Sequence, residues 1–244
     1  MIFHKKRDAV IKLKQSNNPN LRLVQKDSDE LGSKKFLVIT QNELFDFIKK
    51  AQSNNKHPYF YESWLEKTNI LFSLDIDAPN DIDNEKFDKV ISKNITNVIK
   101  SAKNFYDYEY DVDNVIVLKT NKQPNKQSAH VIFRGLAFEN HLICKNFFFR
   151  MIRDKIKLEY CDASIYGLTC LRTCYSTKKG KEFPLLPHKI KIGNNFTSTT
   201  MRTTIIHTCS AQNSNVMRLQ TWANWGVGTV AIKRVQLSVM GITM

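Results

Sequence analysis

The prediction of the fold begins from Ile70-Leu71-Phe72-Ser73-Leu74-Asp75-Ile76-Asp77-Ala78-Pro79. Large apolar residues alternate here with smaller or acidic ones, and alternation at period two predicts a β-strand with one buried and one open face. The apolar residues then enter a core, and Asp75 and Asp77 project from the other face. Pro79 ends the strand, because proline cannot donate a hydrogen bond to a neighbouring strand.

Two aspartates on one strand face are a candidate metal site. Their backbones are roughly 6.5 to 7 Å apart, so both carboxylates can converge on one metal ion or on two ions about 3.5 to 4 Å apart. The alternative is that Asp75 and Asp77 are solvated residues at the end of a strand, before an acidic turn with Asp81 and Asp83. This stretch alone leaves both interpretations open.

Length and charge indicate the class of protein. The 244 residues suit one large domain, or a domain with an appendage. The formal charge of +14, from 37 Lys and Arg against 23 Asp and Glu, favours a polyanionic partner such as nucleic acid. Solubility or a coding bias towards lysine is the alternative. No apolar run approaches 18 residues, and the start lacks the apolar stretch of a signal peptide, so we expect an intracellular protein without a membrane partner.

The cysteines favour neither a disulfide framework nor a zinc site. They number five, an odd count, and none forms a CxxC pair. Cys170 and Cys174, with His188, His207 and Cys209 downstream, are the candidate zinc ligands. They lack a second close pair, so we do not expect a structural zinc ion.

The N-terminal part of the chain is less informative. Residues 1–35 are polar and predict no definite fold, whereas 36–39 predict a short strand. Thr40 and Glu43 form a capping box that opens a helix. The aromatic cluster at 58–64 either packs under a sheet or stacks on bases.

The middle of the chain alternates helices and strands. Apolar residues at steps of three and four between Phe87 and Phe105 predict a long amphipathic helix, and 142–158 predict a second one. Residues 115–118 and 129–133 read as two strands, either a hairpin or adjacent antiparallel neighbours.

Polar residues of the second of these strands could bind phosphate. Ser128 and His130 share a face, directly after a basic turn that includes Lys126. Imidazole and ammonium groups both donate to phosphate oxygens. A lone histidine is more often structural, so this pattern is weak without the rest of the chain.

A third informative segment follows the second helix. Asp162 is either a helix cap or a further metal carboxylate. The run from Arg172 to Lys181 concentrates cations among small residues, which suits the phosphates of a nucleotide or a template strand.

These segments together resemble the archaeo-eukaryotic primase superfamily, especially the primase domains of large nucleocytoplasmic DNA viruses and the eukaryotic primase-polymerases. The first motif of that family, two alternating acids, matches Asp75 and Asp77. Its second motif, a serine two positions before a histidine, matches Ser128 and His130.

Further residues extend the resemblance, which covers about residues 36–190. The lysine that often precedes the second motif matches Lys126, and the aspartate of the third motif matches Asp162. The family also carries a series of residues after the third motif, here Tyr166, Arg172, Ser176, Lys178 and Gly180.

The resemblance implies an α+β fold with an RRM-like antiparallel sheet flanked by helices and an N-terminal α/β part. It implies a catalytic domain over 36–209, preceded by the undetermined segment 1–35. Residues 210–244 form a tail or linker, in which Trp222, Trp225 and 227–232 suggest a strand or hairpin. No phosphate-binding loop of the Walker type is present, so we expect no helicase activity of this chain.

The implied activity is that of a DNA-directed primase or primase-polymerase, a nucleotidyltransferase that makes primers from nucleoside triphosphates in DNA replication. Two Mg²⁺ or Mn²⁺ ions would be held by the catalytic residues Asp75, Asp77 and Asp162. The nucleotide would be bound by Lys126, Ser128, His130, Arg172, Ser176 and Lys178. Expected partners are a single-stranded DNA template, nucleoside triphosphates and a helicase module or other replication partner. If the chain is viral, it would act at replication sites in the host cytoplasm or nucleus.

Three alternatives stand beside this interpretation. A polymerase-β-like nucleotidyltransferase needs a Gly-Ser turn before the aspartates, which 66–69 do not provide. A rolling-circle nicking enzyme needs two alternating histidines, and this strand has His130 alone. The third alternative is an RRM-like protein that binds single-stranded nucleic acid without catalysis.

Overall fold

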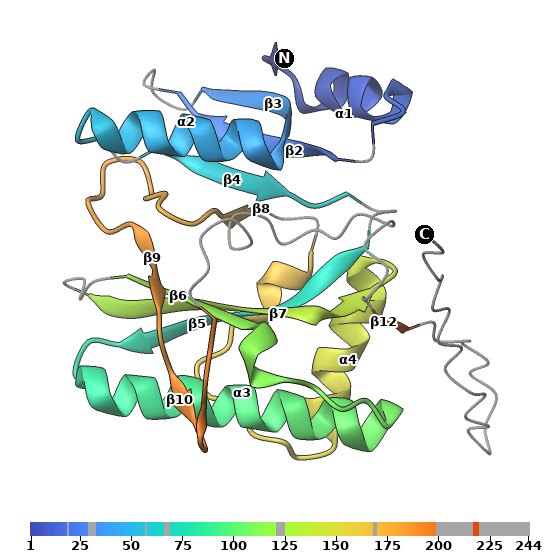
Figure 1. Ribbon diagram of the computed structural model, residues 1–244, viewed down its shortest axis with the longest axis vertical. Coiled ribbons are helices and arrows are strands. Elements are labelled where there is room, and N and C mark those ends of the chain that lie inside the picture. Colours follow the sequence, from blue (N-terminus) through green and yellow to red (C-terminus); the bar gives the residue numbers. More distant parts are fainter. Residues whose placement is uncertain are drawn as a thin grey trace, which may run out of the picture.

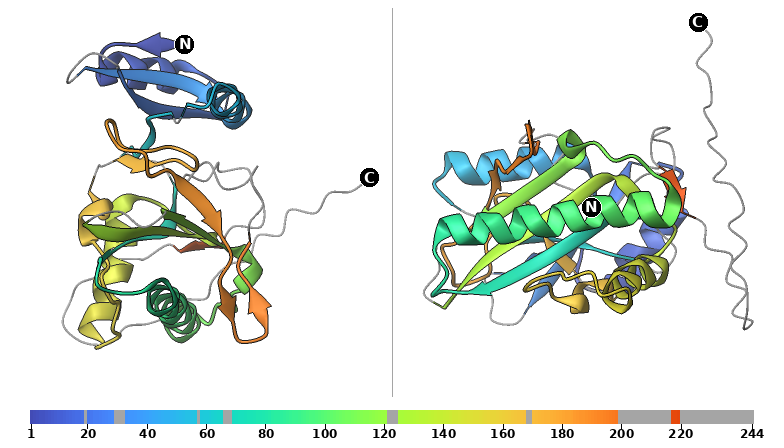
Figure 2. Two further views of the ribbon diagram at one scale, coloured as in Figure 1. Left: turned by 90° about the vertical axis from the view of Figure 1, so that its left-hand side faces the viewer. Right: turned by 90° about the horizontal axis from the view of Figure 1, so that it is seen from below.

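The structure, a computed structural model, describes residues 1–18, 20–28, 33–56, 58–65, 69–120, 125–167 and 170–198, and the backbone of 217–219. These residues form an α+β fold in which two β-sheets lie one above the other (Figures 1 and 2). Helices α1 (Lys6–Gln15) and α2 (Gln41–Ser53) accompany the upper sheet of Figure 1. Helices α3 (Asn84–Tyr106) and α4 (His141–Arg153) lie beneath the lower one.

The upper sheet joins the N-terminal part of the chain to two later segments. Its strands are antiparallel to their neighbours, in the order β1 (Ile2–Phe3), β3 (Lys34–Thr40), β2 (Leu21–Asp27), β4 (Phe60–Ser63) and β8 (Cys170–Arg172). Residues 1–35 therefore supply two strands and a helix, although their polar sequence predicts no definite fold. The capping box of Thr40 and Glu43 is confirmed at the start of α2.

The lower sheet contains the strand from which the prediction began. Its antiparallel strands are β5 (Ile70–Pro79), β7 (Lys126–Phe138), β6 (Val115–Thr120) and β9 (Leu185–His188), and β12 (Met217–Leu219) lies parallel to β7. The expected antiparallel pairing of 115–118 with 129–133 is confirmed. Phe72, Leu74 and Ile76 are buried in one core with apolar residues of α3 and α4, which confirms the predicted buried face of β5.

One short segment adds an edge to this sheet. Cys161 forms an antiparallel bridge with Ile76, so β5 lies between β7 and the segment around Cys161. Along the chain, the order is therefore β5, α3, β6, β7, α4 and this edge segment, a β-α-β-β-α-β arrangement. The 3₁₀ helices η1 (Val112–Asn114) and η2 (Ala163–Tyr166) and the hairpin of β10 (Lys191–Ile192) and β11 (Asn195–Phe196) complete the described elements.

The second predicted helix is shorter than expected. It was predicted to reach Leu158, but α4 ends at Arg153, and Lys155 adopts a positive φ of 60°. A left-handed residue ends a helix because it turns the chain away from the helical path. Ile156 and Leu158 lie in the loop after α4 and pack on the core that α4 shares with β5 and α3. The apolar pattern that predicted the helix therefore extends beyond the end of the helix.

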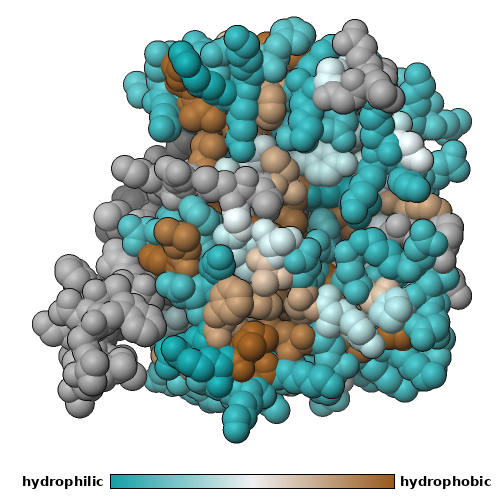
Figure 3. All heavy atoms as spheres, turned by 180° about the vertical axis from the view of Figure 1, so that it is seen from behind, coloured by the Kyte–Doolittle hydropathy of each residue, from teal (hydrophilic) through white to brown (hydrophobic). Residues whose placement is uncertain are grey.

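Seen from behind, the molecular surface is mostly hydrophilic, with an apolar area in its lower central part (Figure 3). No helix in the described ranges is long and apolar enough to cross a membrane. His207, Cys209, Trp222, Trp225 and the predicted strand at 227–232 lie outside the described residues.

Candidate functional site

The first two motifs lie side by side on neighbouring strands. In the register of β5 and β7, Asp75 is opposite His130 and Asp77 is opposite Ser128. The Ser128 hydroxyl donates to Asp77 Oδ1 over 2.6 Å, and the Lys126 ammonium donates to Asp77 Oδ2. His130 Nε2 lies 3.5 Å from Asp75 Oδ1. All these side chains share the face of the lower sheet that points away from α3 and α4.

The third acid reaches the same place from a distant part of the chain. The Asp162 amide donates to the Asp75 carbonyl over 2.8 Å, and the Asp77 amide donates to the Tyr160 carbonyl over 2.9 Å. The Asp162 carboxylate caps η2, because it accepts from the Ser164 amide and hydroxyl, each over 2.8 Å. Asp162 is thus the helix cap that the sequence suggested, and it also lies beside the other two acids.

The upper sheet closes the site from the other side. A pocket of about 160 Å³ opens between the sheets and is lined from β5 and β7 by Asp75, Asp77, Ser128 and His130, from β4 and β8 by Tyr61, Cys170, Leu171 and Arg172, and from loops by Ser164, Ile165 and Lys178. Strand β8 is the edge strand of the upper sheet and lies on the side of that sheet nearer the lower one (Figure 1), which is why a short strand can carry residues of the pocket wall. The acids therefore face cations across a small cavity.

Arg172 is the buried cation of this pocket. It is 6% exposed, and its Nη1 donates to the Phe183 carbonyl over 3.1 Å. Its buried Nε has no hydrogen-bond partner among the described residues. A buried donor without a partner is costly, so this group is available for an anionic ligand.

Burial and neighbouring charges shift the acid–base properties of the site. Burial, and then the charges of Asp77 and Asp162, raise the pKa of Asp75 to about 6, although Lys126 and Lys178 act in the opposite direction. Burial lowers the pKa of Lys178, and the nearby cations Lys126 and Arg172 lower it further. The site thus combines Asp75 and Asp77 with Arg172, Lys178 and the nearby Lys126, which suits a ligand that carries both cation and phosphate.

The donor chemistry of the acids suits a divalent cation. Carboxylate oxygens are the ligands that Mg²⁺ and Mn²⁺ prefer. Within the described ranges, no three His, Cys, Asp or Glu side chains are already arranged to hold a metal ion. Asp77 is engaged by Lys126 and Ser128, and Asp162 by Ser164. These residues fit a metal in type and neighbourhood, and binding requires the carboxylates to exchange these partners.

Two residues of the expected series lie elsewhere. The Ser176 hydroxyl is fully buried, within 2.8 Å of the Thr173 hydroxyl and 3.4 Å of the Phe60 amide, and it does not line the pocket. Tyr166 is buried beneath β5, where its hydroxyl donates to the Ser73 carbonyl over 2.7 Å. Both support the strands that carry the site.

The sequence did not single out every residue of the pocket. Tyr61 is paired with Arg172 across β4 and β8, and burial raises its pKa to about 12. The aromatic density of 58–64 was the available signal, but it did not distinguish Tyr61 from its neighbours. Ser164 and Ile165 carried no signal, because their role depends on where η2 docks.

A scan against models of known protein families and a search of curated proteins both returned no match for this chain. The geometry of the site therefore carries the functional argument.

Proposed function

We propose that this chain is the catalytic domain of a DNA primase or primase-polymerase, which makes primers from nucleoside triphosphates on a single-stranded DNA template. The observation that carries the proposal is that Asp75 and Asp77 line one pocket with Arg172 and Lys178, while the backbone of Asp162 is bonded to Asp75 beside that pocket. Nucleotidyl transfer needs these two features, because a metal must be held on one side of the phosphates and the phosphates must be held in line.

Each group has a defined task in this proposal. Asp75, Asp77 and Asp162 would hold Mg²⁺ or Mn²⁺, and a bound ion would make the attacking hydroxyl more acidic and offset the charge of the phosphates. Arg172 donates from its unpartnered Nε to a phosphate oxygen. Lys126, Ser128, His130 and Lys178 supply further donors to the triphosphate.

The topology of the lower sheet supports a primase-type core. The β-α-β-β-α-β order, with the Cys161 segment beside β5, is compatible with the RRM-like sheet that the resemblance implies. The upper sheet with α1 and α2 is compatible with the expected N-terminal α/β part, although its strand β8 comes from later in the chain. A helicase module or another replication partner would supply the single-stranded template.

The alternative is an RRM-like protein that binds single-stranded nucleic acid without catalysis. The net charge of +14 favours it as much as it favours a primase. The partly buried Asp75 beside Asp77 favours the enzyme, because acids repel phosphate unless a cation lies between them.

A primer-synthesis assay separates these functions. The chain is incubated with single-stranded template, Mn²⁺ or Mg²⁺ and labelled nucleotides, and wild type is compared with Asp77→Ala. We expect a metal-dependent ladder for wild type and a loss of at least about 100-fold for Asp77→Ala, with template binding retained. Asp81→Ala, which changes an exposed acid after the same strand, is the matched control and keeps full activity.

Two results would reject the enzyme. Synthesis by Asp77→Ala at the wild-type rate would show that the acids of β5 are not catalytic. Template binding by wild type, without a product under any combination of metal and nucleotide, would leave the binding protein as the better account.

A further inference from the structure

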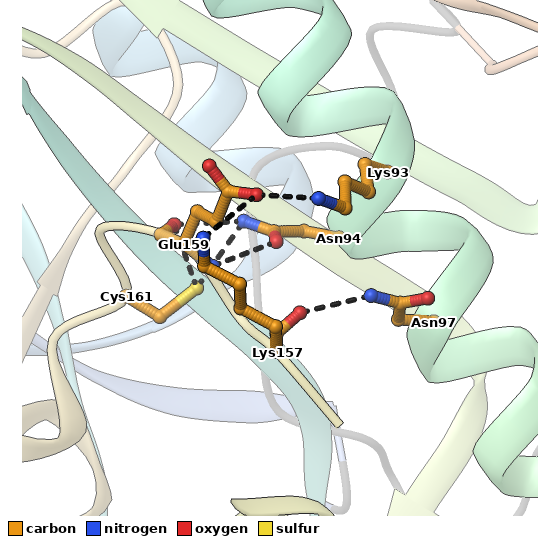
Figure 4. Close-up of polar contacts among 6 residues, drawn as sticks. All are labelled: Lys93, Asn94, Asn97, Lys157, Glu159 and Cys161. Carbon is orange, nitrogen blue, oxygen red and sulfur yellow. Dashed lines mark hydrogen bonds and ion pairs between the residues drawn. The ribbon is translucent and has the colours of Figure 1, made fainter. Parts of the chain in front are cut away.

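We infer that Asn94 of α3 is a positioning residue that sets the place of Asp162 at the site; this inference rests on the function proposed above. Asn94 is fully buried, and its side chain points at the backbone of the segment that leads to Asp162 (Figure 4). Its Nδ2 donates to the Glu159 carbonyl over 2.9 Å, and its Oδ1 accepts from the Glu159 amide over 3.0 Å.

The side-chain amide of Asn94 acts as a neighbouring strand would. It satisfies both backbone groups of one residue, which is the pattern of a hydrogen-bonded pair in an antiparallel sheet. On the other side of the segment, the Tyr160 carbonyl and the Asp162 amide bond to β5. The segment is therefore held from both sides, by Asn94 at Glu159 and by β5 at Tyr160 and Asp162.

The backbone between these two attachments is strained. Tyr160 has a φ of 57°, in the left-handed region that is unfavourable for a residue with a Cβ atom. Such a conformation persists where its surroundings impose it, and here the flanking bonds at Glu159 and Asp162 do so. Because Tyr160 lies two residues before Asp162, its φ determines the direction from which Asp162 reaches Asp75.

Asparagine is the residue type that this contact requires. Its short side chain carries both a donor and an acceptor, whereas alanine has neither. Alanine at position 94 leaves the amide and the carbonyl of Glu159 without the partner that Asn94 supplies, so Tyr160 can relax to a negative φ. We expect Asp162 then to move away from the position that it shares with Asp75 and Asp77.

Neighbouring contacts provide matched controls. Asn97, one turn further along α3, donates from Nδ2 to the Lys157 carbonyl over 2.8 Å (Figure 4). It is the same residue type on the same helix, but its bond ends five positions before Asp162 and does not flank Tyr160. Lys93 contacts the side chain of Glu159 over 2.7 Å, without touching its backbone.

The test measures Mn²⁺ binding directly, by electron paramagnetic resonance of the free ion, on proteins whose folding is verified by circular dichroism. We expect Asn94→Ala to weaken Mn²⁺ binding about tenfold, as the loss of an outer-shell contact does. Asn97→Ala should change it less than about twofold, within the effect of a remote contact. Asp162→Asn provides the reference for complete loss of the third carboxylate.

A rescue variant separates positioning from general destabilisation. In the Asn94→Ala background, Tyr160→Gly places a residue at position 160 that adopts positive φ without a steric penalty. We expect Mn²⁺ binding to recover most of its loss, although nothing restores the contact of Asn94. If Asn94→Ala does not fold, Asn94→Ser is used in both backgrounds with the same comparisons.

The outcomes are distinct. Three results would overturn the positioning role and leave the proposed function intact. They are wild-type Mn²⁺ affinity in the Asn94 variant, an equal loss of Mn²⁺ affinity in Asn97→Ala, and no recovery of Mn²⁺ affinity with Tyr160→Gly. Wild-type protein that binds no Mn²⁺ would overturn the metal-dependent function, and this inference with it.

Discussion

At the scale of single residues, the site brings three acids close together, of which Asp77 is already paired with Lys126. Asp75 is enclosed by the protein, and Asp77 and Asp162 are its near neighbours. Arg172 is buried on the facing wall, and its Nε has no hydrogen-bond partner in the part of the chain that the structure describes. Such groups lower the stability of the ligand-free protein, and they prepare a site for cation and phosphate.

Asp75→Asn should therefore stabilise the metal-free protein while it abolishes primer synthesis. The pKa of Asp75 is about 6 in the folded protein against 3.8 for the ordinary group, so the native state binds more protons than the unfolded state between these values. Wild-type stability consequently falls as pH rises through this window, because the charged carboxylate is disfavoured. The asparagine variant avoids this loss, and we expect a gain on the order of 2 kcal/mol above about pH 7.

Thermal unfolding in the presence of a chelator measures this gain. The Tm difference should be largest above about pH 7 and should shrink as pH falls towards about 4, because Asp75 is then protonated in the folded state and increasingly protonated in the unfolded state. A variant that is less stable than wild type at neutral pH would contradict the electrostatic account of Asp75.

At the scale of elements, α3 is attached to the lower sheet by a three-residue polar contact as well as by its apolar face. Lys119 Nζ of β6 lies 2.6 Å from Asp88 Oδ1, and His188 Nε2 of β9 lies 3.0 Å from Asp88 Oδ2. The contact connects α3, which also carries Asn94, to two strands of the sheet. Figure 2 shows α3 in front of the lower sheet when the molecule is seen from below.

Asp88→Asn should loosen this attachment. Burial raises the pKa of Asp88, but the hydrogen bonds from His188 and Lys119 outweigh it and hold the pKa below its ordinary value. Lys119 is 9% exposed. In the Asp88→Asn variant its ammonium group therefore remains largely shielded from water but has lost the negative charge of Asp88. We expect a loss on the order of 1 to 2 kcal/mol at neutral pH, less than for a fully buried pair because Asp88 is partly exposed.

The pH dependence of this loss has the opposite sign to that of Asp75. A depressed folded pKa stabilises the protein above the unfolded pKa, and the stabilisation disappears as pH falls through the folded pKa. The difference in Tm between wild type and Asp88→Asn should therefore vanish under acidic conditions. Asp81→Asn, an exposed acid, is the control, and a deficit that persists in acid would point to packing instead of charge.

At the scale of the whole molecule, the pocket exists because the two sheets share distant parts of the chain. Strand β8 follows η2, which docks on the lower sheet, yet β8 pairs with β4 of the upper sheet. As a result, Arg172 lies on the wall of the pocket formed by the upper sheet, although it is only ten residues after Asp162 in the chain. The chain as a whole carries a surplus of positive charge, whereas the pocket itself is lined by the partly buried acids Asp75 and Asp77.

Binding of single-stranded DNA should accordingly depend strongly on salt. If three to five phosphates are neutralised, affinity should fall about 20- to 100-fold between about 50 and 200 mM salt. Fluorescence anisotropy with a labelled oligonucleotide measures this slope, and Asp77→Ala should show the same slope as wild type. A change below about threefold would mean that the charge of the chain does not serve nucleic-acid binding.

The sequence by itself determined the local features of this protein. The period-two pattern of residues 70–79 identified a strand with Asp75 and Asp77 on its open face, and Ser128 and His130 were correctly expected on one face of another strand. The capping box of Thr40 was equally readable. These features depend on residues a few positions apart, so backbone geometry alone relates them.

Tertiary structure decided which distant segments meet. It placed Asp162 beside Asp75, drew Arg172 and Tyr61 to the facing wall, and turned Ser176 into a buried support. It also made strands of residues 1–35, because their backbone groups find partners in β3 and β4. Such outcomes depend on pairing and burial between residues far apart in the chain, and no local pattern encodes which partner satisfies a given amide or carboxylate.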